Sequence, residues 1–530
     1  MKKKEEKKMK KDTREQLKRS RIGALSLVGE GVLVGAIAGM VVTLYRLALE
    51  YADELRGFVI HQAKGHPGTM ALWFVILAAL ATLVYLLLKF EPLIGGSGIP
   101  QLEGEITGAL EQSWWRVVLA KFAGGLLSMF GGLALGREGP SIQLGAMMGK
   151  GTGAILKSSQ SRKRFLMTCG ASAGLSAAFH APLAGVLFSL EEVHKNFSVS
   201  LLIGVMSSSL TADFLTSLIL GEKVVFQIPL TRMISYHEYG YILLLGLVLG
   251  VAGAFYNWFT LKCQDFYRRL SFLPGVLKVM IPFALAGVLA FTMPQLLGSG
   301  HGLIDALTSK EMALTAMVGI LLGRFIFSGL SFGAGVPGGI FFPLLVIGGF
   351  IGGVFAKSAS LTLGLDPIYL NNFVVLAMAG YFAAIVRAPL TGILLLFEMT
   401  GSLGQMLSLS VVSIVAYVVA TLLGSEPIYE SLLERLLHKR SKENAQVTVK
   451  PGEKVISIYA VEADSYLDGA TIKDILWPEN TLVVSVQRGN NDIIPSGDTL
   501  LVVGDQLMLM TTKEGQLEAD TKMRKLCACV

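Results

Sequence analysis

The stretch Gly136-Arg137-Glu138-Gly139-Pro140 interrupts a strongly apolar part of the sequence, and similar glycine-rich interruptions occur in GSGIP (96–100) and GVPGGIF (335–341). Backbone N–H groups that such a break frees cannot be satisfied by lipid, so breaks persist inside a membrane only where they line a protected cavity. Helix N-termini that begin at a break carry partial positive charge and favour an anion. The three segments therefore predict broken membrane helices around an anion site.

Composition places the chain among polytopic membrane proteins, because 52% of its 530 residues are hydrophobic, only 16% are charged and the mean hydropathy is +0.58. The net charge of +7 comes from residues 1–21, which hold eleven Lys or Arg and four Asp or Glu. This basic segment precedes the first long apolar stretch and is predicted to be a cytoplasmic tail. The rest of the chain is neutral overall, so no nucleic-acid partner is predicted.

An internal repeat divides the apolar region, 22–437, into halves at about 22–220 and 235–437. The paired landmarks are Gly96-Ser97-Gly98 with Gly298-Ser299-Gly300, Pro140 with Pro337, and the run from Ala181 (APLAGVLFSLEE) with the run from Ala388 (APLTGILLLFEM). Many apolar intervals are shorter than the roughly 20 residues that a full span needs. Half-length and broken helices are therefore predicted in both halves.

The composition changes abruptly after Leu437, where a charged linker (438–450) begins. Stretches rich in β-branched and apolar residues then predict strands in a small soluble domain, 451–515, which is followed by a tail, 516–530. The predicted strands are Val455 to Val461, Thr481 to Val486, Leu500 to Val503 and Leu507 to Met510. Gly504-Asp505 separates the last two, which predicts a hairpin between them.

Together the three glycine-rich breaks resemble the signature segments of the CLC family of chloride channels and proton-coupled chloride exchangers, and the resemblance extends from about residue 22 to 437. It implies an all-α polytopic membrane fold with inverted repeats and broken helices, assembled as a homodimer in the cell membrane. If each inverted half crosses the membrane an odd number of times, the two ends of the pair of halves lie on the same side of the membrane. Both termini are therefore expected in the cytoplasm.

The C-terminal domain is similar to the C-terminal half of RCK-type (TrkA-C-like) domains, which occur on potassium transporters. The similar pattern consists of Leu467-Asp468-Gly469, Arg488-Gly489 and the segment from Ile494 to Leu507. This resemblance implies a small cytosolic α/β regulatory domain that binds a small ligand, such as a cyclic dinucleotide, at a subunit interface. The alternative is a plain cap that stabilises the dimer.

The CLC resemblance assigns a chloride-binding set to residues in the breaks and to one tyrosine near the end of the helical region. Ser97 offers a neutral hydroxyl donor, backbone N–H groups of the breaks add positive potential, and Tyr429 matches an inner-gate tyrosine. The expected set is Ser97, Gly98, Ile99, Gly139, Ile340, Phe341 and Tyr429. Two alternatives stay open: Ser97 as a helix N-cap and Tyr429 as an interfacial belt tyrosine.

Two glutamates are predicted to carry protons. A carboxylate at mid-bilayer costs about 2.5–3.5 kcal/mol even on a lenient scale, so Glu138 is expected to be functional. The resemblance makes Glu138 the gating glutamate, which occupies the anion site when ionised, and makes Glu192 the internal proton-transfer glutamate, with Glu191 as its structural partner. The alternatives are a structural Arg137–Glu138 pair and, for Glu192, a solvated helix end.

Other charged residues have weaker assignments. Lys121 and Arg324 occupy equivalent places in the two halves and either raise the potential near the pathway or snorkel to the interface. Arg387 and Glu398 are expected to form a structural pair or to lie at the interface. His180 is expected to be a packing residue and His301 to lie in a loop.

The leading prediction is a homodimeric secondary transporter that exchanges chloride for protons, with a passive chloride channel of the same fold as the alternative. A potassium transporter would need a Thr-Val-Gly-Tyr-Gly-type filter, and no such run occurs. Enzyme motifs such as His-Glu-x-x-His and Gly-x-Ser-x-Gly are also missing from the sequence. Neither an enzymatic activity nor a metal or resident cofactor is predicted.

Overall fold

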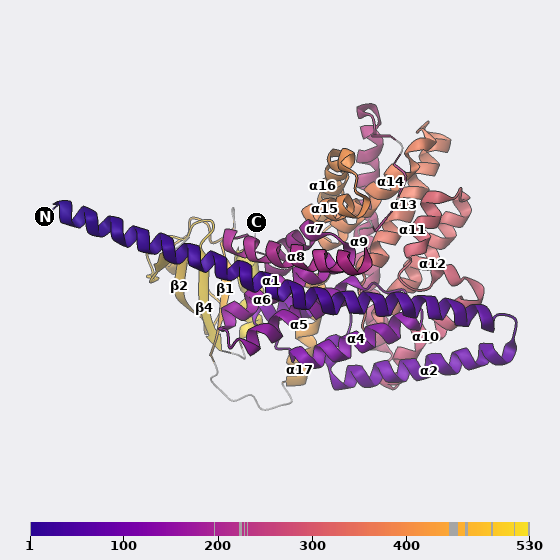
Figure 1. The fold of residues 1–530 in the computed structure, drawn as a ribbon, viewed down its shortest axis with the longest axis horizontal. Helices are drawn as coiled ribbons and strands as arrows, with labels where there is room; N and C mark the ends of the chain where they lie inside the picture. Colours follow the sequence, from indigo (N-terminus) through magenta and orange to yellow (C-terminus); the bar gives the residue numbers. More distant parts are fainter. Residues whose placement is uncertain are drawn as a thin grey trace. The chain divides into compact units, whose positions relative to one another are not determined.

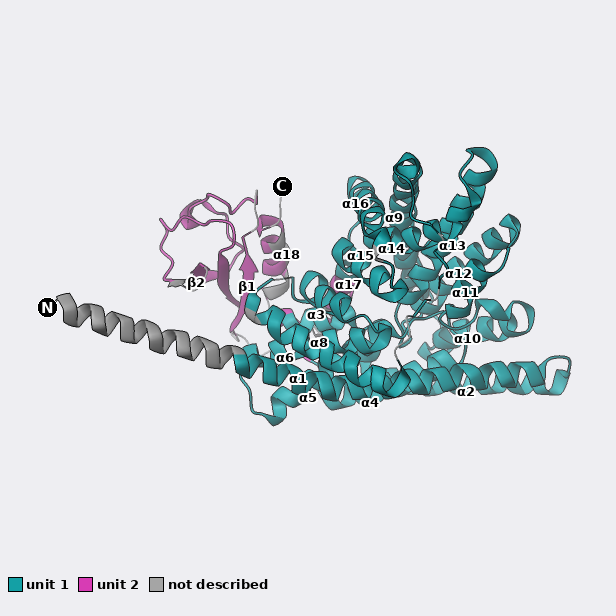
Figure 2. Cartoon of the chain, turned by 45° about the horizontal axis from the view of Figure 1, so that its top comes forward, with its two compact units in different colours: residues 1–106, 112–431 teal, residues 107–111, 432–530 magenta. Residues whose placement is uncertain are grey.

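The computed structural model describes residues 2–195, 197–221, 225–226, 228–230, 232–444, 454–461, 465–488, 491–512 and 515–527. The chain forms two compact units, which Figure 2 shows in different colours. A large helical unit consists of Met1–Ile106 and Gln112–Ser431, and a smaller unit consists of Thr107–Glu111 and Leu432–Val530.

The helical unit contains two successive sets of helices in matching order, which Figure 1 shows from indigo to orange. The first set is α1 (Lys2–Ala63), α2 (Pro67–Phe90), α3 (Ile99–Thr107), α4 (Trp114–Phe130), α5 (Glu138–Ile155), α6 (Gln160–Phe179), α7 (Pro182–Phe188) and α8 (Val199–Leu220). The second set is α9 (Tyr239–Arg269), α10 (Gly275–Thr292), α11 (His301–Ser309), α12 (Leu314–Gly333), α13 (Phe341–Thr362), α14 (Leu370–Val386), α15 (Pro389–Thr400) and α16 (Met406–Leu422). Helix α17 (Ile428–Asn444) follows.

Equivalent helices of the two sets start at the repeated sequence landmarks. Helices α3 and α11 have nine residues each and begin directly after Gly-Ser-Gly, and α7 and α15 begin at the proline of Ala-Pro-Leu. Proline is favoured in the first turn of a helix, because the N–H that it lacks would have no intrahelical partner there. The predicted internal repeat and short, broken helices are thereby confirmed.

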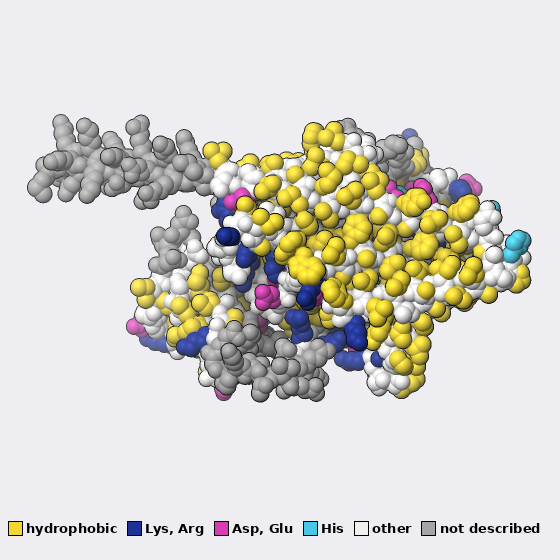
Figure 3. All heavy atoms as spheres, turned by 60° about the horizontal axis from the view of Figure 1, so that its bottom comes forward, with side chains coloured by type: hydrophobic (Ala, Val, Ile, Leu, Met, Phe, Trp, Pro, Cys, Tyr) yellow, Lys and Arg dark blue, Asp and Glu magenta, His cyan; other side chains and the backbone are white. Residues whose placement is uncertain are grey.

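Within the described residues, eight helices are long and apolar enough to cross a membrane. Their outward-facing positions are apolar as well, for example Leu44 on α1 and Phe214 on α8. Figure 3 shows such apolar side chains spread over the surface of the helical region. A soluble protein rarely exposes so extensive an apolar surface, so the prediction of a multi-pass membrane protein is confirmed.

Close helix packing depends on glycine where backbones touch. Helices α5 and α6 pack side by side, and a Cβ atom added to Gly145 on α5 would lie 2.1 Å from the carbonyl oxygen of Gly170 on α6. The reverse contact is equally tight, at 2.1 Å from a Gly170 Cβ to the Gly145 oxygen. Any side chain at either position would therefore push the two helices apart.

The smaller unit contains a four-stranded antiparallel sheet with the strand order β1-β4-β2-β3. Its strands are β1 (Lys454–Ala460), β2 (Leu482–Arg488), β3 (Asn491–Ile493) and β4 (Gln506–Thr512). Helix α18 (Gln516–Cys527) packs on the sheet, and its Met523 joins the buried core with Leu507 and Leu509. The predicted small α/β domain is thereby confirmed.

Two details of the predicted domain are wrong. Leu500–Val503 is not a strand, because its buried Leu501 exchanges backbone hydrogen bonds with the loop around Ala470 rather than with a sheet edge. Gly504-Asp505 is therefore no hairpin turn, and strand β4, which follows it, pairs instead with β1 and β2. Gly489, which was part of the predicted pattern, lies outside the described residues.

Asp505 stabilises the buried loop instead. Its carboxylate accepts two hydrogen bonds of 2.8 Å from the Arg488 guanidinium and one of 3.0 Å from the Val502 N–H. Desolvation works to raise the pKa of Asp505, but these hydrogen bonds and the Arg488 charge outweigh it and hold the pKa below its usual range. The turn is thus held by a charged pair within the domain.

The close contact of α5 with α6 yields a stability prediction. Gly145→Ala places a methyl group against the Gly170 backbone and is expected to destabilise the protein by about 1–3 kcal/mol. Thermal unfolding in detergent, followed by loss of the monodisperse chromatographic peak, measures this effect. Gly319→Ala on α12 is the matched control, since a Cβ there meets nothing within 4 Å. An equal midpoint for the two variants would contradict the prediction.

Candidate functional site

Backbone hydrogen bonds join the three glycine-rich breaks directly to one another. Gly96 donates its N–H to Val336 O at 3.1 Å, and Gly338 donates to Gly96 O at 3.1 Å. Gly136 donates to Gly339 O at 2.7 Å, and Gly339 donates back to Gly136 O at 2.8 Å. The break at 335–341 therefore lies between the other two and is bonded to both.

Three helix N-termini begin at these joined breaks. Helix α3 starts at Ile99, α5 at Glu138 and α13 at Phe341, so each begins within three residues of a bonded glycine. The first N–H groups of a helix lack intrahelical partners, and the helix dipole adds positive potential there. Helix ends from both repeats therefore present unsatisfied donors to one buried region, which is suited to an anion.

Ser97 lies in this region and is 2% exposed. Its hydroxyl oxygen accepts a hydrogen bond of 3.4 Å from the Ile99 N–H, so it caps the start of α3. A capping hydroxyl still has its own hydrogen to donate to an anion, and the two predicted roles of Ser97 are compatible. Gly139 packs against this serine, because an added Cβ would lie 2.7 Å from Ser97 O. Gly98, which lies between Ser97 and Ile99, turns the chain with a φ of +93°.

Glu138 is the first residue of α5 and its side chain is fully buried. Its carboxylate lies near the backbone N–H of Phe342, yet neither oxygen completes a hydrogen bond within the described part of the chain. A Cβ on Gly136 would lie 2.3 Å from Glu138 Oε2, which places the carboxylate directly over the joined breaks. Burial of an unpaired carboxylate is costly, so this position points to a function.

The alternative structural pair of Arg137 with Glu138 is not formed. Arg137 instead donates to Glu50 on α1 at 3.0 Å, and Arg46 donates to the same carboxylate at 3.0 Å. Adjacent helical residues do not face each other, which explains why Arg137 turns away. Glu138 is therefore left without a salt bridge to its neighbour.

Tyr429 is the second residue of α17 (Ile428–Asn444) and is fully buried, with no hydrogen-bond partner for its hydroxyl among the described residues. It is close enough to interact electrostatically with both Glu138 and Glu192. Its burial rules out the alternative of an interfacial belt tyrosine. Phe341, the first residue of α13, is also fully buried and lies in an aromatic cluster with Phe382 at a centroid distance of 4.7 Å.

Glu192 lies on a π-helix, η2 (Ser189–His194), that continues α7. The alternative of a solvated helix end is wrong, because Glu192 is 5% exposed and its Oε1 lacks a hydrogen bond within the described chain. Glu191 is not its partner either. The Glu191 carboxylate accepts from the Thr391 N–H at 2.9 Å and from the Thr391 hydroxyl at 2.8 Å.

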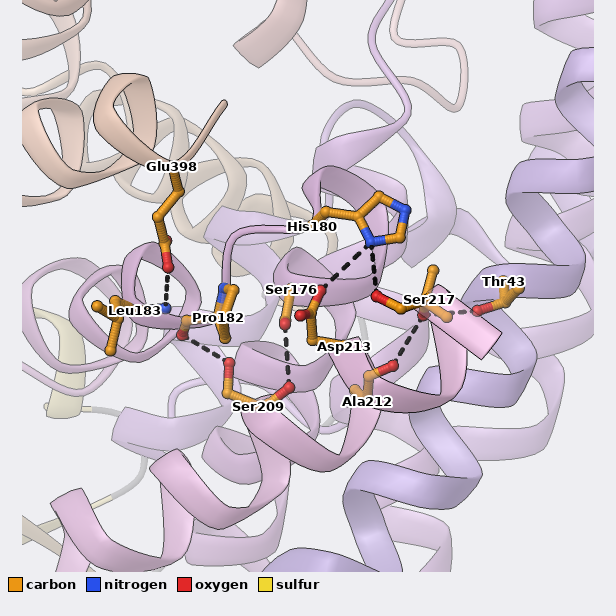
Figure 4. A network of polar contacts seen from close by, with 11 residues as sticks. Thr43, Ser176, His180, Pro182, Leu183, Ser209, Ala212, Asp213, Ser217 and Glu398 are labelled. Carbon is orange, nitrogen blue, oxygen red and sulfur yellow. Dashed lines mark hydrogen bonds and ion pairs between the residues drawn. The ribbon is translucent and has the colours of Figure 1, made fainter. Parts of the chain in front are cut away.

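Glu191 and Glu398 cap each other's helix across the two repeats. Glu191 accepts from Thr391 and Leu390 in the first turn of α15, while Glu398 on α15 accepts from Leu183 at 2.9 Å and Ala184 at 2.8 Å in the first turn of α7. Figure 4 shows the second of these contacts. Carboxylates stabilise helix N-termini by satisfying orphan N–H groups and by opposing the dipole.

Lys121 and Arg324 do not snorkel, because both are fully buried. Lys121 Nζ donates to Ile94 O at 2.8 Å and to Gly96 O at 2.7 Å. Arg324 donates to Leu296 O at 2.7 Å and, at 2.6 Å, to the oxygen of the equivalent Gly298. Each cation thus satisfies carbonyls at the Gly-Ser-Gly segment of its own repeat.

The predicted pair of Arg387 with Glu398 is also wrong. Arg387 NH1 donates to Tyr417 O and NH2 donates to Ser425 O, each at 2.6 Å. Its partners are backbone carbonyls at and just beyond the end of α16 rather than the carboxylate of α15. Arg387 therefore binds within its own repeat, whereas Glu398 binds the first turn of α7 in the other repeat.

Both histidines differ from expectation. His180 Nδ1 lies 3.4 Å from Asp213 Oδ1 and 3.5 Å from Ser217 Oγ, so it belongs to a polar network rather than to apolar packing (Figure 4). His301 begins α11 and stacks between Phe226 and Phe342, at centroid distances of 5.3 and 5.7 Å. Asp213 was missed because nothing near it in the sequence marks it.

Joined breaks, converging helix N-termini and a buried unpaired carboxylate define the class of membrane ion-transport proteins built from broken helices. The family described as Voltage gated chloride channel matches residues 77–421, and the TrkA-C domain family matches residues 456–523. The chain belongs to this voltage-gated chloride channel (CLC) family and carries a C-terminal TrkA-C domain. It is a transport protein, not an enzyme.

Named relatives are exchangers. The chain is 36% identical to the H(+)/Cl(-) exchange transporter ClcA of Vibrio campbellii over 428 residues, which cover 78% of this chain and 90% of that protein. It is 32% identical to ClcA of Salmonella agona over 434 residues, 79% of this chain and 91% of that protein. A crystal structure of a slow cyanobacterial Cl-/H+ antiporter matches with a TM-score of 0.74 and 30% identity, over 78% of this chain and 98% of that one.

The reciprocal caps yield a stability prediction. Glu398→Gln keeps the shape but removes the charge that faces the first turn of α7, and it is expected to cost about 0.5–2 kcal/mol. Thermal unfolding of the purified protein in detergent measures the loss. Glu311→Gln, at an exposed position outside the helices, serves as the control. If both variants unfold at the wild-type midpoint, the cap does not stabilise the fold.

Proposed function

We propose that this chain exchanges chloride for protons across the membrane as a secondary active transporter. The observation that carries the proposal is Glu138, a fully buried carboxylate without a hydrogen bond in the described structure, which lies over the joined breaks. The named relatives that cover most of this chain are H(+)/Cl(-) exchange transporters, which favours exchange over a passive channel.

Chloride binds in the region of the three helix N-termini. The proposed ligands are the Ser97 hydroxyl, the Tyr429 hydroxyl and the N–H groups of the breaks, with Gly98, Ile99, Gly139, Ile340 and Phe341 forming the rest of the site. Neutral donors hold an anion without a fixed counter-ion, so it can also leave. The unsatisfied Tyr429 hydroxyl supports this assignment, since a buried donor without a partner is costly.

Glu138 couples the two ions. When ionised, its carboxylate competes with chloride for the same donors, and when protonated it no longer needs them and withdraws. Each withdrawal therefore carries a proton and admits an anion. Glu192, which interacts electrostatically with the same Tyr429, passes the proton between this region and the cytoplasm.

The transporter acts as a homodimer in the cell membrane, with both termini in the cytoplasm. Exposed apolar side chains at four-residue spacing on α8 (Leu210, Phe214, Leu218) and on α16 (Ile414, Val418, Leu422) form continuous stripes suited to a second subunit. The basic segment 1–21 agrees with a cytoplasmic N-terminus, because positive residues flank spans on that side. The chain continues from α17, which ends at Asn444, to the C-terminal domain, and this domain includes α18 (Gln516–Cys527) in addition to the predicted residues 451–515.

The C-terminal domain regulates transport by binding a small ligand, such as a cyclic dinucleotide, at a subunit interface. The TrkA-C match supports a regulatory domain of this kind but does not name a ligand. A plain dimer-stabilising cap is the competing role. The two differ in whether a ligand changes the rate of exchange.

The exchange mechanism predicts uphill proton movement. In liposomes with an outward chloride gradient and no pH gradient, the wild-type protein is expected to drive protons inward as chloride leaves, so the external pH rises. Glu192→Gln is expected to abolish this proton movement while chloride efflux continues, because the substitution removes the internal proton carrier. A pH electrode and a chloride electrode in the same chamber follow both ions.

Two outcomes would contradict the exchange mechanism. Chloride flux without proton movement in the wild type would make this protein a channel. Proton movement that persists in Glu192→Gln would remove Glu192 from the proton pathway. Glu311→Gln, an exposed charge removal outside the helices, should leave both fluxes at wild-type level.

The regulatory role predicts ligand binding to the full-length dimer. Titration calorimetry with a cyclic dinucleotide is expected to give saturable heat, and the same ligand should change the initial chloride efflux rate at least twofold. A variant truncated after residue 444 is the control and should show neither effect. Saturable binding without a rate change, or no binding at all, would favour the structural cap.

A further inference from the structure

Lys195 sits among three glutamates that come from three different elements. Its Nζ lies 2.8 Å from Glu103 Oε1 on α3 and also forms an ion pair with Glu430 on α17. The third carboxylate, Glu192, lies three residues earlier on η2 and interacts electrostatically with Lys195. One ammonium group therefore serves a cluster of three carboxylates that lie far apart in the sequence.

The members of this cluster differ in how far their side chains are exposed to solvent. The side chains of Lys195 and Glu430 are 34% and 39% exposed, whereas the Glu103 side chain is only 2% exposed. Glu192 is nearly as deeply buried, at 5%. The cluster therefore connects two partly exposed charges to two buried carboxylates.

The local backbone fits a functional role for this position. Segment η2 is a π-helix, a rare form that often marks functional sites. It ends at Lys195, which adopts a left-handed φ of +52° although it is not glycine. Such a conformation is disfavoured for a residue other than glycine and persists where surrounding contacts hold it, and here the ion pairs of Lys195 provide those contacts.

The charges around Glu192 determine how Lys195 affects the ionisation of its carboxyl group. Among the described residues, the charges that act most strongly on Glu192 are the Lys195 ammonium and the carboxylates of Glu103, Glu430 and Glu191. Like charges in a buried cluster oppose ionisation, and a nearby cation favours it. The ammonium therefore opposes the combined effect of burial and of the neighbouring carboxylates, and makes the Glu192 proton easier to release.

We propose that Lys195 is a positioning residue for the proton branch of transport, which sets the pH range over which Glu192 loads and releases protons. The proposal rests on the exchange function proposed above. By holding Glu430, the same cation also fixes the first turn of α17, in which Tyr429 directly precedes Glu430. Proton loading of Glu192 and the position of the gate tyrosine are thus linked through one side chain.

The test measures the number of protons moved per chloride in liposomes, with the same pH on both sides and varied stepwise. Lys195→Met removes the charge but keeps the length, so Glu192 should hold its proton more tightly. The midpoint at which proton coupling declines is expected to move to higher pH by about one unit. Lys195→Arg retains the charge and should keep the wild-type midpoint.

A second variant tests the sign of the effect. Glu103→Gln removes a like charge beside Glu192 and is expected to move the midpoint to lower pH, opposite to Lys195→Met. A structural disturbance alone would not shift the two variants in opposite directions. Equal midpoints for wild type and Lys195→Met, or shifts in the same direction, would overturn the proposal.

Failure of this proposal is distinct from failure of the exchange mechanism. If the wild type moves chloride without protons, the exchange function itself is wrong. If the wild type exchanges normally and Lys195→Met keeps the wild-type midpoint, only the role of Lys195 is wrong. Should Lys195→Met fail to fold, Glu103→Gln against wild type still decides, because a midpoint that does not fall would overturn the proposal.

Discussion

Four backbone hydrogen bonds between glycine-rich breaks hold the centre of this protein together. They pair Gly96 with the segment around Pro337, and Gly136 with Gly339, so that segments from both repeats share their polar groups. Backbone at membrane depth must find partners within the protein. Pairing break with break meets that requirement within the breaks, and helices α3, α5 and α13 begin directly after them with first-turn N–H groups that have no intrahelical partner. The proposed anion site is thus a consequence of how the breaks satisfy one another.

Buried charges elsewhere in the helical unit mostly support this centre. Lys121 and Arg324 satisfy carbonyls beside the two Gly-Ser-Gly segments, and Glu191 and Glu398 satisfy helix starts across the repeats. A buried charge that is fully hydrogen-bonded is a structural element, because its desolvation cost is offset locally. Glu138 lacks such hydrogen bonds, and this difference separates a candidate transport residue from its charged neighbours.

The sequence predicted the features that depend on only a few neighbouring residues. Glycine-rich breaks, the repeat landmarks and a carboxylate at a helix start are all visible within a few residues, so the fold and the candidate Glu138 site could be inferred. Partners across the repeats could not be inferred, because Glu191 contacts a residue 200 positions away. The strand predicted at Leu500–Val503 failed for a related reason: β propensity does not reveal that a loop offers better partners than a sheet edge.

The reciprocal caps bear on the origin of the fold. Glu191 and Glu398 occupy equivalent positions, and each satisfies the helix start of the opposite repeat. In an ancestral half-length chain, a single glutamate would have met both requirements when two copies paired about a two-fold axis. Neither copy alone would have satisfied its own helix start. On this view, fusion of the two copies preserved an older intermolecular contact, and the two glutamates are its surviving halves.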